Sequence, residues 1–116
     1  MSNKKNTPAQ NTTLRGELTA ADLDALKKEH GVLRKITVEV AGEKIVCYCK
    51  KPDRNTVAAA LSKRGQNKVL EAGETILANC KVAGEEEFET NDNVRIAAAM
   101  ECYSLLDFLP TQSEEV

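Results

Sequence analysis

The stretch 45–64 constrains the fold more than any other part of the chain, because it turns a strand directly into a helix. Residues 45–49 form an apolar run that is typical of a strand, and two lysines follow it. Pro52 ends the strand, since it has no N–H to donate to a sheet, and Asp53 is a suitable N-cap for the next helix. A helix and a hairpin are expected before this stretch and only helices after it. The sequence therefore predicts the α+β class, as a small single domain with an antiparallel β-hairpin packed by about four α-helices.

Alternating side chains predict the β-hairpin over 34–50. Apolar residues alternate with polar ones in the first strand, and Gly42-Glu43 fits a two-residue type II′ loop, which needs Gly first. That loop pairs Val40 with Ile45, Val38 with Cys47 and Ile36 with Cys49. Both cysteines then share the apolar face, whereas Val46 and Tyr48 lie on the opposite face, half exposed or under another element.

Capping residues and the three- and four-residue spacing of apolar side chains predict four helices, at 19–30, 53–64, 67–82 and 92–109. Thr19 is the expected N-cap of the first helix and Asn67 that of the third. Gly73 lies inside the third helix, where Gly costs about 1 kcal/mol relative to Ala, so another element is expected to approach it closely. After the third helix, Gly84 and three glutamates predict a loop, with Phe88 as a buried plug.

The two ends of the chain carry no apolar pattern. Residues 1–13 are predicted to form a disordered arm and 111–116 a disordered acidic tail, which leaves one domain over 14–110. No apolar run is long enough to span a membrane and no secretory signal is visible, so we expect a cytoplasmic protein with reduced cysteines.

Charge is distributed unevenly along the chain. The net charge is −2, but residues 1–49 sum to +2, residues 50–68 to +5 and residues 69–116 to −9. A basic middle and an acidic C-terminal third favour the steering of a partner, or the head-to-tail docking of copies.

No set of residues predicts an enzyme or a metal site. Cys47, Cys49, Cys80 and Cys102 lack the Cys-x₂-Cys spacing of zinc knuckles and fall among apolar residues, so they are predicted to be core thiols. The single histidine has no nucleophile assigned to it, and no phosphate-binding Gly loop or paired carboxylate motif is present. We therefore expect no catalytic residue, no metal and no cofactor.

The segment 50–68 concentrates basic side chains, namely Lys50, Lys51, Arg54, Lys63, Arg64 and Lys68. A nucleic-acid-binding patch is one interpretation. A solvated face is the other, because the chain is acidic overall and no aromatic residues interleave with the basic ones for base stacking.

An ordered set of short motifs over 16–109 resembles the small tail assembly chaperones of tailed phages and prophages. These motifs are Gly16-Glu-Leu-Thr-Ala-Ala-Asp-Leu23, then Gly31 with the hairpin, Lys50-Lys51-Pro52-Asp53-Arg54, Leu77-Ala-Asn79-Cys80, Val82-Ala-Gly84-Glu-Glu86, and a last helix after Asn91-Asp92. None of the motifs is catalytic.

The resemblance implies a non-enzymatic chaperone in the cytoplasm of a bacterial host. Such a chaperone binds the phage tape-measure protein during tail morphogenesis, keeps it soluble and recruits tail-tube subunits. The residues expected to contact the partner are Tyr48, Lys50, Lys51, Arg54, Lys63 and Arg64. The alternative is a small nucleic-acid-binding phage accessory protein that uses the basic segment 50–68. A third hypothesis is an enzyme subunit whose partner supplies the chemistry.

Overall fold

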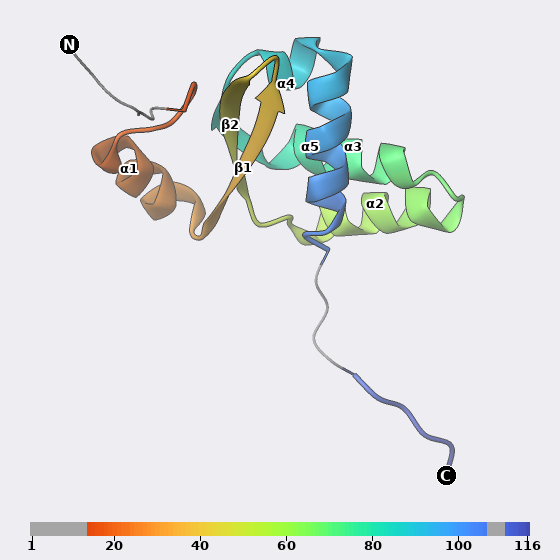
Figure 1. Ribbon diagram of the computed structural model, residues 1–116. Helices are drawn as coiled ribbons and strands as arrows, with labels where there is room; N and C mark the ends of the chain where they lie inside the picture. Colours follow the sequence, from red (N-terminus) through yellow and green to blue (C-terminus); the bar gives the residue numbers. More distant parts are fainter. Residues whose placement is uncertain (1–13, 107–110) are drawn as a thin grey trace, which may run out of the picture.

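The computed structural model describes residues 14–106 and 111–116, and it confirms the α+β class (Figure 1). The elements follow one another as α1 (Ala20–His30), β1 (Leu33–Val40), β2 (Glu43–Lys50), α2 (Arg54–Gly65), α3 (Val69–Cys80), β3 (Lys81–Gly84), α4 (Glu87–Thr90) and α5 (Asp92–Tyr103). The three strands form one antiparallel sheet in the order β1-β2-β3. The predicted arm 1–13 lies outside the described residues, and residues 111–116 are exposed and in neither helix nor strand.

The hairpin forms as predicted, but its register differs by two residues. Val40 pairs with Glu43, Val38 with Ile45 and Ile36 with Cys47, so the two-residue loop is Ala41-Gly42 and not Gly42-Glu43. Both loop residues have positive φ, 51° at Ala41 and 82° at Gly42, as a type I′ turn requires. A shift of two residues keeps every side chain on its predicted face, and both cysteines are buried together.

The loop predicted after α3 is in fact a third strand and a short helix. β3 pairs with the outer edge of β2 through Cys47–Gly84 and Tyr48–Ala83, and α4 follows it. The outer edge of β2 presents backbone N–H and C=O groups that need hydrogen-bond partners. The chain is extended where it leaves α3, and it provides these partners. Phe88, predicted as a plug, is buried in α4.

Asn67 ends α2, whereas it was predicted to begin α3. Its φ is +64°, its N–H donates to the Arg64 carbonyl (2.9 Å), and the next N–H, from Lys68, donates to the Lys63 carbonyl (2.9 Å). This pair of bonds is a Schellman motif, with Asn at the left-handed position where Gly is usual. Asn is one of the few residues that tolerate this backbone conformation.

The last helix begins at its predicted first residue, Asp92, and ends earlier than predicted. Asn91 accepts hydrogen bonds from the N–H groups of Asn93 and Val94, whereas α5 ends at Tyr103 and a turn follows. Residues 107–110 of the predicted helix lie outside the described residues.

The core lies between one face of the sheet and the helices α3 and α5 (Figure 1). The helix α2 packs against α3. Its largest fully buried side chains include Phe88, Ile45, Ile76 and Val94. α1 has the predicted N-cap, because Thr19 accepts a hydrogen bond from the Asp22 N–H, but none of its residues is buried. The helix therefore stands at the side of the sheet as an accessory element.

Candidate functional site

A groove with a basic rim opens where four segments meet. The start of β1, the end of β2, the first turns of α2 and the turn after α5 enclose a volume of about 480 Å³. The groove, which we call the basic groove, is lined by Val32, Arg34, Lys50, Lys51, Pro52, Val57 and Leu105. Pro52 and Asp53 create it, because they stop β2 and start α2 within two residues and so set the helix across the end of the sheet.

The lining of the basic groove carries only positive charge, and Asp53 beside it interacts electrostatically with Lys50. All three charged residues that line it, Arg34, Lys50 and Lys51, are basic. Within residues 14–106 and 111–116, none of the three forms an ion pair, although other lysines and arginines of the domain do. Four apolar side chains make up the remainder of the lining. This combination suits a ligand that is apolar on one side and acidic on its margin.

The predicted contact residues fall into two groups along α2. Arg54, the first residue of the helix, is exposed beside the basic groove. Lys63 and Arg64 lie nine and ten residues further along, so about 14 Å separates them from Arg54. Lys63 also forms an ion pair with Glu71 (3.5 Å). The structure thus brings Lys50, Lys51 and Arg54 together, and it does not place Lys63 and Arg64 in the same groove.

The prediction that Tyr48 is an exposed contact residue is wrong. Its side chain is 3% exposed, and its hydroxyl accepts a hydrogen bond from the Leu18 N–H (3.2 Å). The segment that leads into α1 therefore lies against Tyr48. The sequence pattern allowed this face of β2 to be half exposed or to lie under another element, and the second alternative is correct.

Five residues of the basic groove were not predicted as part of a site: Val32, Arg34, Pro52, Val57 and Leu105. Val32 is 78% exposed, more than any other large apolar side chain within residues 14–106. One sequence feature could have marked Val32 as a surface residue: it directly follows Gly31 and belongs to neither the helical nor the strand pattern. Leu105 carried no local signal, because only the fold brings it beside β2.

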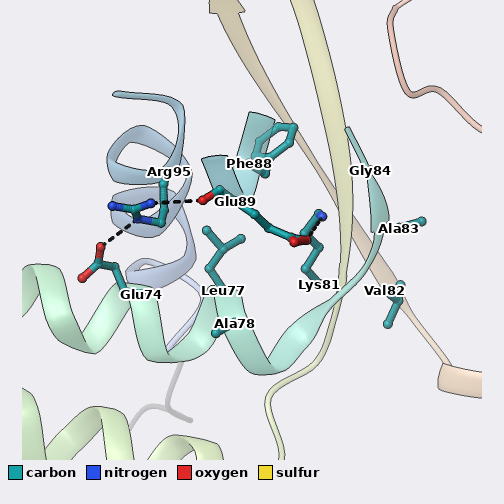
Figure 2. Close-up of a pocket in the computed structure, with 10 residues that line it drawn as sticks. All are labelled: Glu74, Leu77, Ala78, Lys81, Val82, Ala83, Gly84, Phe88, Glu89 and Arg95. Atoms are coloured by element: carbon teal, nitrogen blue, oxygen red, sulfur yellow. Dashed lines mark hydrogen bonds and ion pairs between the residues drawn. The ribbon is translucent and has the colours of Figure 1, made fainter. Parts of the chain in front are cut away.

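A second hollow, of about 550 Å³, lies beside the outer edge of β3 (Figure 2). Leu77, Ala78 and Phe88 provide its apolar surface. Its charged side chains are paired with one another, since Arg95 binds Glu74 (3.2 Å) and Lys81 binds Glu89 (2.9 Å). Because its charges are already satisfied, this hollow has less electrostatic attraction for a charged ligand than the basic groove has.

The acidic C-terminal third is also partly neutralised within the domain. Arg15 binds both Glu85 (3.0 Å) and Glu87 (2.7 Å), and its guanidinium holds the pKa of Glu87 below its usual range by hydrogen bonding. Hydrogen bonding to Lys81 likewise lowers the pKa of Glu89. The glutamate-rich segment that was predicted to be a loop therefore contains several internal ion pairs.

The four cysteines are buried free thiols, as predicted. Hydrogen bonding to the Cys49 sulfur raises the pKa of Cys47 and of Cys102, and burial raises it further. Burial raises the pKa of Cys80 to about 11. Hydrogen bonds from the thiols of Cys102 and Cys47 lower the pKa of Cys49. All four sulfurs are nevertheless buried and inaccessible, which is the opposite of what a cysteine nucleophile needs.

Among the residues that the structure describes, no group of three or more His, Cys, Asp and Glu side chains is arranged to hold a metal ion. None of the described helices is both long and apolar enough to cross a membrane. Comparison of the chain with protein-family models, with curated proteins and with solved structures finds no match.

Proposed function

We propose that the protein is a non-enzymatic tail assembly chaperone, and that its basic groove binds the tape-measure protein of a phage. The observation that carries the proposal is the basic groove itself, with three cations that form no ion pair among the described residues and an apolar lining. The short motifs over 16–109 add the resemblance to phage tail assembly chaperones. The implied setting is the cytoplasm of a bacterial host, without a cofactor.

The groove suits one side of an amphipathic helix. Apolar side chains of the partner would pack on Val57 and Leu105, and burial of apolar surface contributes about 25 cal/mol per Å². Carboxylates on the margin of the partner helix would face Lys50 and Lys51. Such charge complementarity mainly raises the association rate and fixes orientation. An elongated partner that continued along α2 would also reach Lys63 and Arg64.

A chaperone of this kind needs affinity without turnover. Covering the apolar side of tape-measure helices keeps them from associating with each other, because exposed apolar patches drive aggregation. Tail-tube subunits would be recruited through a second surface of the complex. The absence of a reaction is part of the proposal, and the burial of all four thiols is consistent with it.

The second candidate is a nucleic-acid-binding accessory protein. The cations at Arg34, Lys50 and Lys51, with Arg54 beside them, favour it, because phosphate contacts dominate such binding. Two observations weigh against it. Tyr48, the aromatic residue just before the basic segment 50–68, is buried and cannot stack on a base. Lys63 forms an ion pair with Glu71.

Co-expression of the chain with its neighbouring tape-measure gene tests the proposal. We expect the tape-measure protein to become soluble and to remain on the tagged chaperone during a pull-down. A tape-measure protein that is equally soluble alone and is not retained refutes the chaperone function. Tight, salt-sensitive binding of DNA or RNA by the same preparation supports the second candidate instead.

A further inference from the structure

The two outer edges of the hairpin are treated differently by the described chain. The outer edge of β2 is covered along its length, by Arg15 beside residues 44–46 and by β3 beside residues 47–49. The eight residues of β1 pair only with β2, and no other segment among residues 14–106 and 111–116 pairs with the outer edge of β1. An exposed edge of this length is a template for another strand.

The direction of the backbone groups on β1 follows from the bonds of β2. The Lys44 carbonyl and the Val46 N–H bond to Arg15, so they point away from β1. Their partners across the hairpin, Glu39 and Thr37, then direct their own N–H and C=O groups away from β2, because hydrogen-bonded and non-hydrogen-bonded pairs alternate in an antiparallel ladder. The same alternation turns Lys35 outward. The free edge therefore offers its groups at residues 35, 37 and 39.

We propose that this edge binds the same edge of a second copy, antiparallel and centred on Thr37. A two-fold axis at Thr37 pairs Thr37 with its own counterpart, and Lys35 of each copy with Glu39 of the other. All three pairs join residues whose backbone groups point outward, so a regular ladder forms. The two three-stranded sheets would become one sheet of six strands in the order β3-β2-β1-β1-β2-β3.

The side chains of β1 are self-complementary in this register and in few others. Lys35 and Glu39 are equally spaced on either side of Thr37, so the pairing creates two opposite-charge pairs, and opposite charges directly across a ladder are stabilising. On the other face, Ile36 meets Val38 of the second copy twice. An edge lysine usually protects against pairing, but here the mirror position holds a carboxylate.

Neighbouring groups leave room for the second strand. A hollow of about 560 Å³ runs along the edge, lined by residues 35–39 and, on α5, by Ala97 and Glu101. Ile96 and Met100 form the adjacent stripe of the same helix and are 40% and 44% exposed. Lys35 already forms an ion pair with Glu17, and in the dimer it would lie between that carboxylate and Glu39 of the second copy.

Disulfide trapping tests both the dimer and its register. The four native thiols are fully buried, so mild oxidation reports on an introduced cysteine. Thr37→Cys is expected to give a disulfide-linked dimer, because hydrogen-bonded partners have Cα atoms about 5.5 Å apart, within disulfide range. Glu39→Cys should not self-link, since four residues along the strand separate the two thiols by roughly 13 Å. Mixing the Lys35→Cys and Glu39→Cys chains should restore linkage.

Sedimentation of the unmodified chain supplies the reversible measurement. The chain should move from monomer to twice its mass as concentration rises. Lys35→Glu should raise the dimer dissociation constant by roughly tenfold, and Lys35→Glu/Glu39→Lys should restore it, because two attractions become repulsions and then attractions again. A chain that stays monomeric up to its solubility limit overturns the proposal. So does self-linkage of Glu39→Cys that is as efficient as that of Thr37→Cys, because it requires another register. These readouts need no tape-measure protein and are independent of the proposed function.

Discussion

Gly73 on α3 lies directly against the carbonyl group of Ala99 on α5, and this contact sets how closely the two main core helices approach. A Cβ added to Gly73 would overlap the Ala99 carbonyl oxygen and would press on its Cβ (3.3 Å). Gly73, Ala98 and Ala99 are all buried, so the small side chains allow nearly direct backbone contact. The close approach that the sequence predicted at this glycine is confirmed.

The first prediction is that Gly73→Ala destabilises the domain, although Ala is the better helix former. Overpacking against a backbone group costs about 1–3 kcal/mol, which exceeds the gain of about 1 kcal/mol in helix propensity. Chemical denaturation measures the difference. Gly65→Ala at the end of α2 is the matched control, because nothing lies within 4 Å of its added Cβ, and it should be neutral or stabilising. Equal effects of the two substitutions would contradict the close contact.

The second prediction concerns the hairpin turn. Ala41 has a φ of 51°, which is unfavourable for a residue with a Cβ, whereas Asn tolerates it. Ala41→Asn creates the Asn-Gly pair that type I′ turns prefer, and it should raise the free energy of unfolding by about 0.5–1 kcal/mol. Ala41→Val should lower it. Thermal unfolding of the three chains gives the order. If Val were tolerated as well as Asn, the loop would not be Ala41-Gly42.

The third prediction is a pH dependence that originates at the cap of α2. Asp53 accepts a hydrogen bond from the Thr56 N–H (2.8 Å), and this bond, with a smaller contribution from Lys50, lowers the pKa of Asp53. The unfolded chain releases this proton near pH 3.9, so the stabilisation is present above that pH and is lost as the pH falls through the folded value.

Asp53→Asn separates the cap from its titration, since Asn also caps helices. As the pH falls from neutral to below about 4, we expect this variant to lose less stability than the natural chain, because the titrating carboxylate is gone, with little change at neutral pH. Asp53→Ala should lose about 1 kcal/mol at neutral pH. Urea denaturation across this pH range is the measurement. An Asn variant as acid-sensitive as the natural chain would place the titration elsewhere.

The fourth prediction concerns the thiols. All four cysteines are buried, so alkylation of the native protein should be slow whatever the protonation state of each thiol, and it should become complete for all four on unfolding. Purified protein should also contain no stoichiometric zinc and keep its melting temperature in a chelator. One zinc per chain by elemental analysis would contradict the assignment of core thiols.

The sequence predicted the faces of the hairpin better than its register. Alternation decides which side chains share a face, and it survives any shift by two residues. The loop position depends on a small energy difference between turn types, and the choice of Gly42 as the first loop residue was wrong. The structure instead accepts a positive φ at Ala41, which lengthens both strands to eight residues.

Short elements were predicted least well, because their stability comes from their neighbours. β3 has four residues, without a pattern of its own, and exists because β2 has an outer edge to satisfy. Asn67 is a good N-cap in isolation and also a good left-handed residue, and the backbone bonds of Lys63 and Arg64 select the second role.

The candidate site was predicted only in part for a related reason. Lys50 and Lys51 were identified from the basic run in the sequence, but charge alone placed Lys63 and Arg64 in the same surface. The apolar lining comes from residues as distant in sequence as Val32 and Leu105. Only tertiary structure brings these residues together.

The fifth prediction is that binding of the tape-measure protein depends on the cations around the basic groove. Lys51→Glu/Arg54→Glu should slow association, weaken the complex by roughly tenfold and reduce its salt dependence, because surface charge sets the approach of a partner. Both side chains are exposed, so the free energy of unfolding should change by less than about 0.5 kcal/mol. Lys27→Glu/Lys28→Glu on α1 is the control, with the same change in net charge on exposed residues away from the groove.

The most direct test of the central claim is a pull-down of the co-expressed tape-measure protein by these three chains, at two salt concentrations. The proposal predicts that the natural chain and the α1 double variant retain soluble tape-measure protein, and that the groove double variant loses most of it. Equal retention by all three chains, or equal loss in both variants, would contradict a role for the basic groove in binding the tape-measure protein.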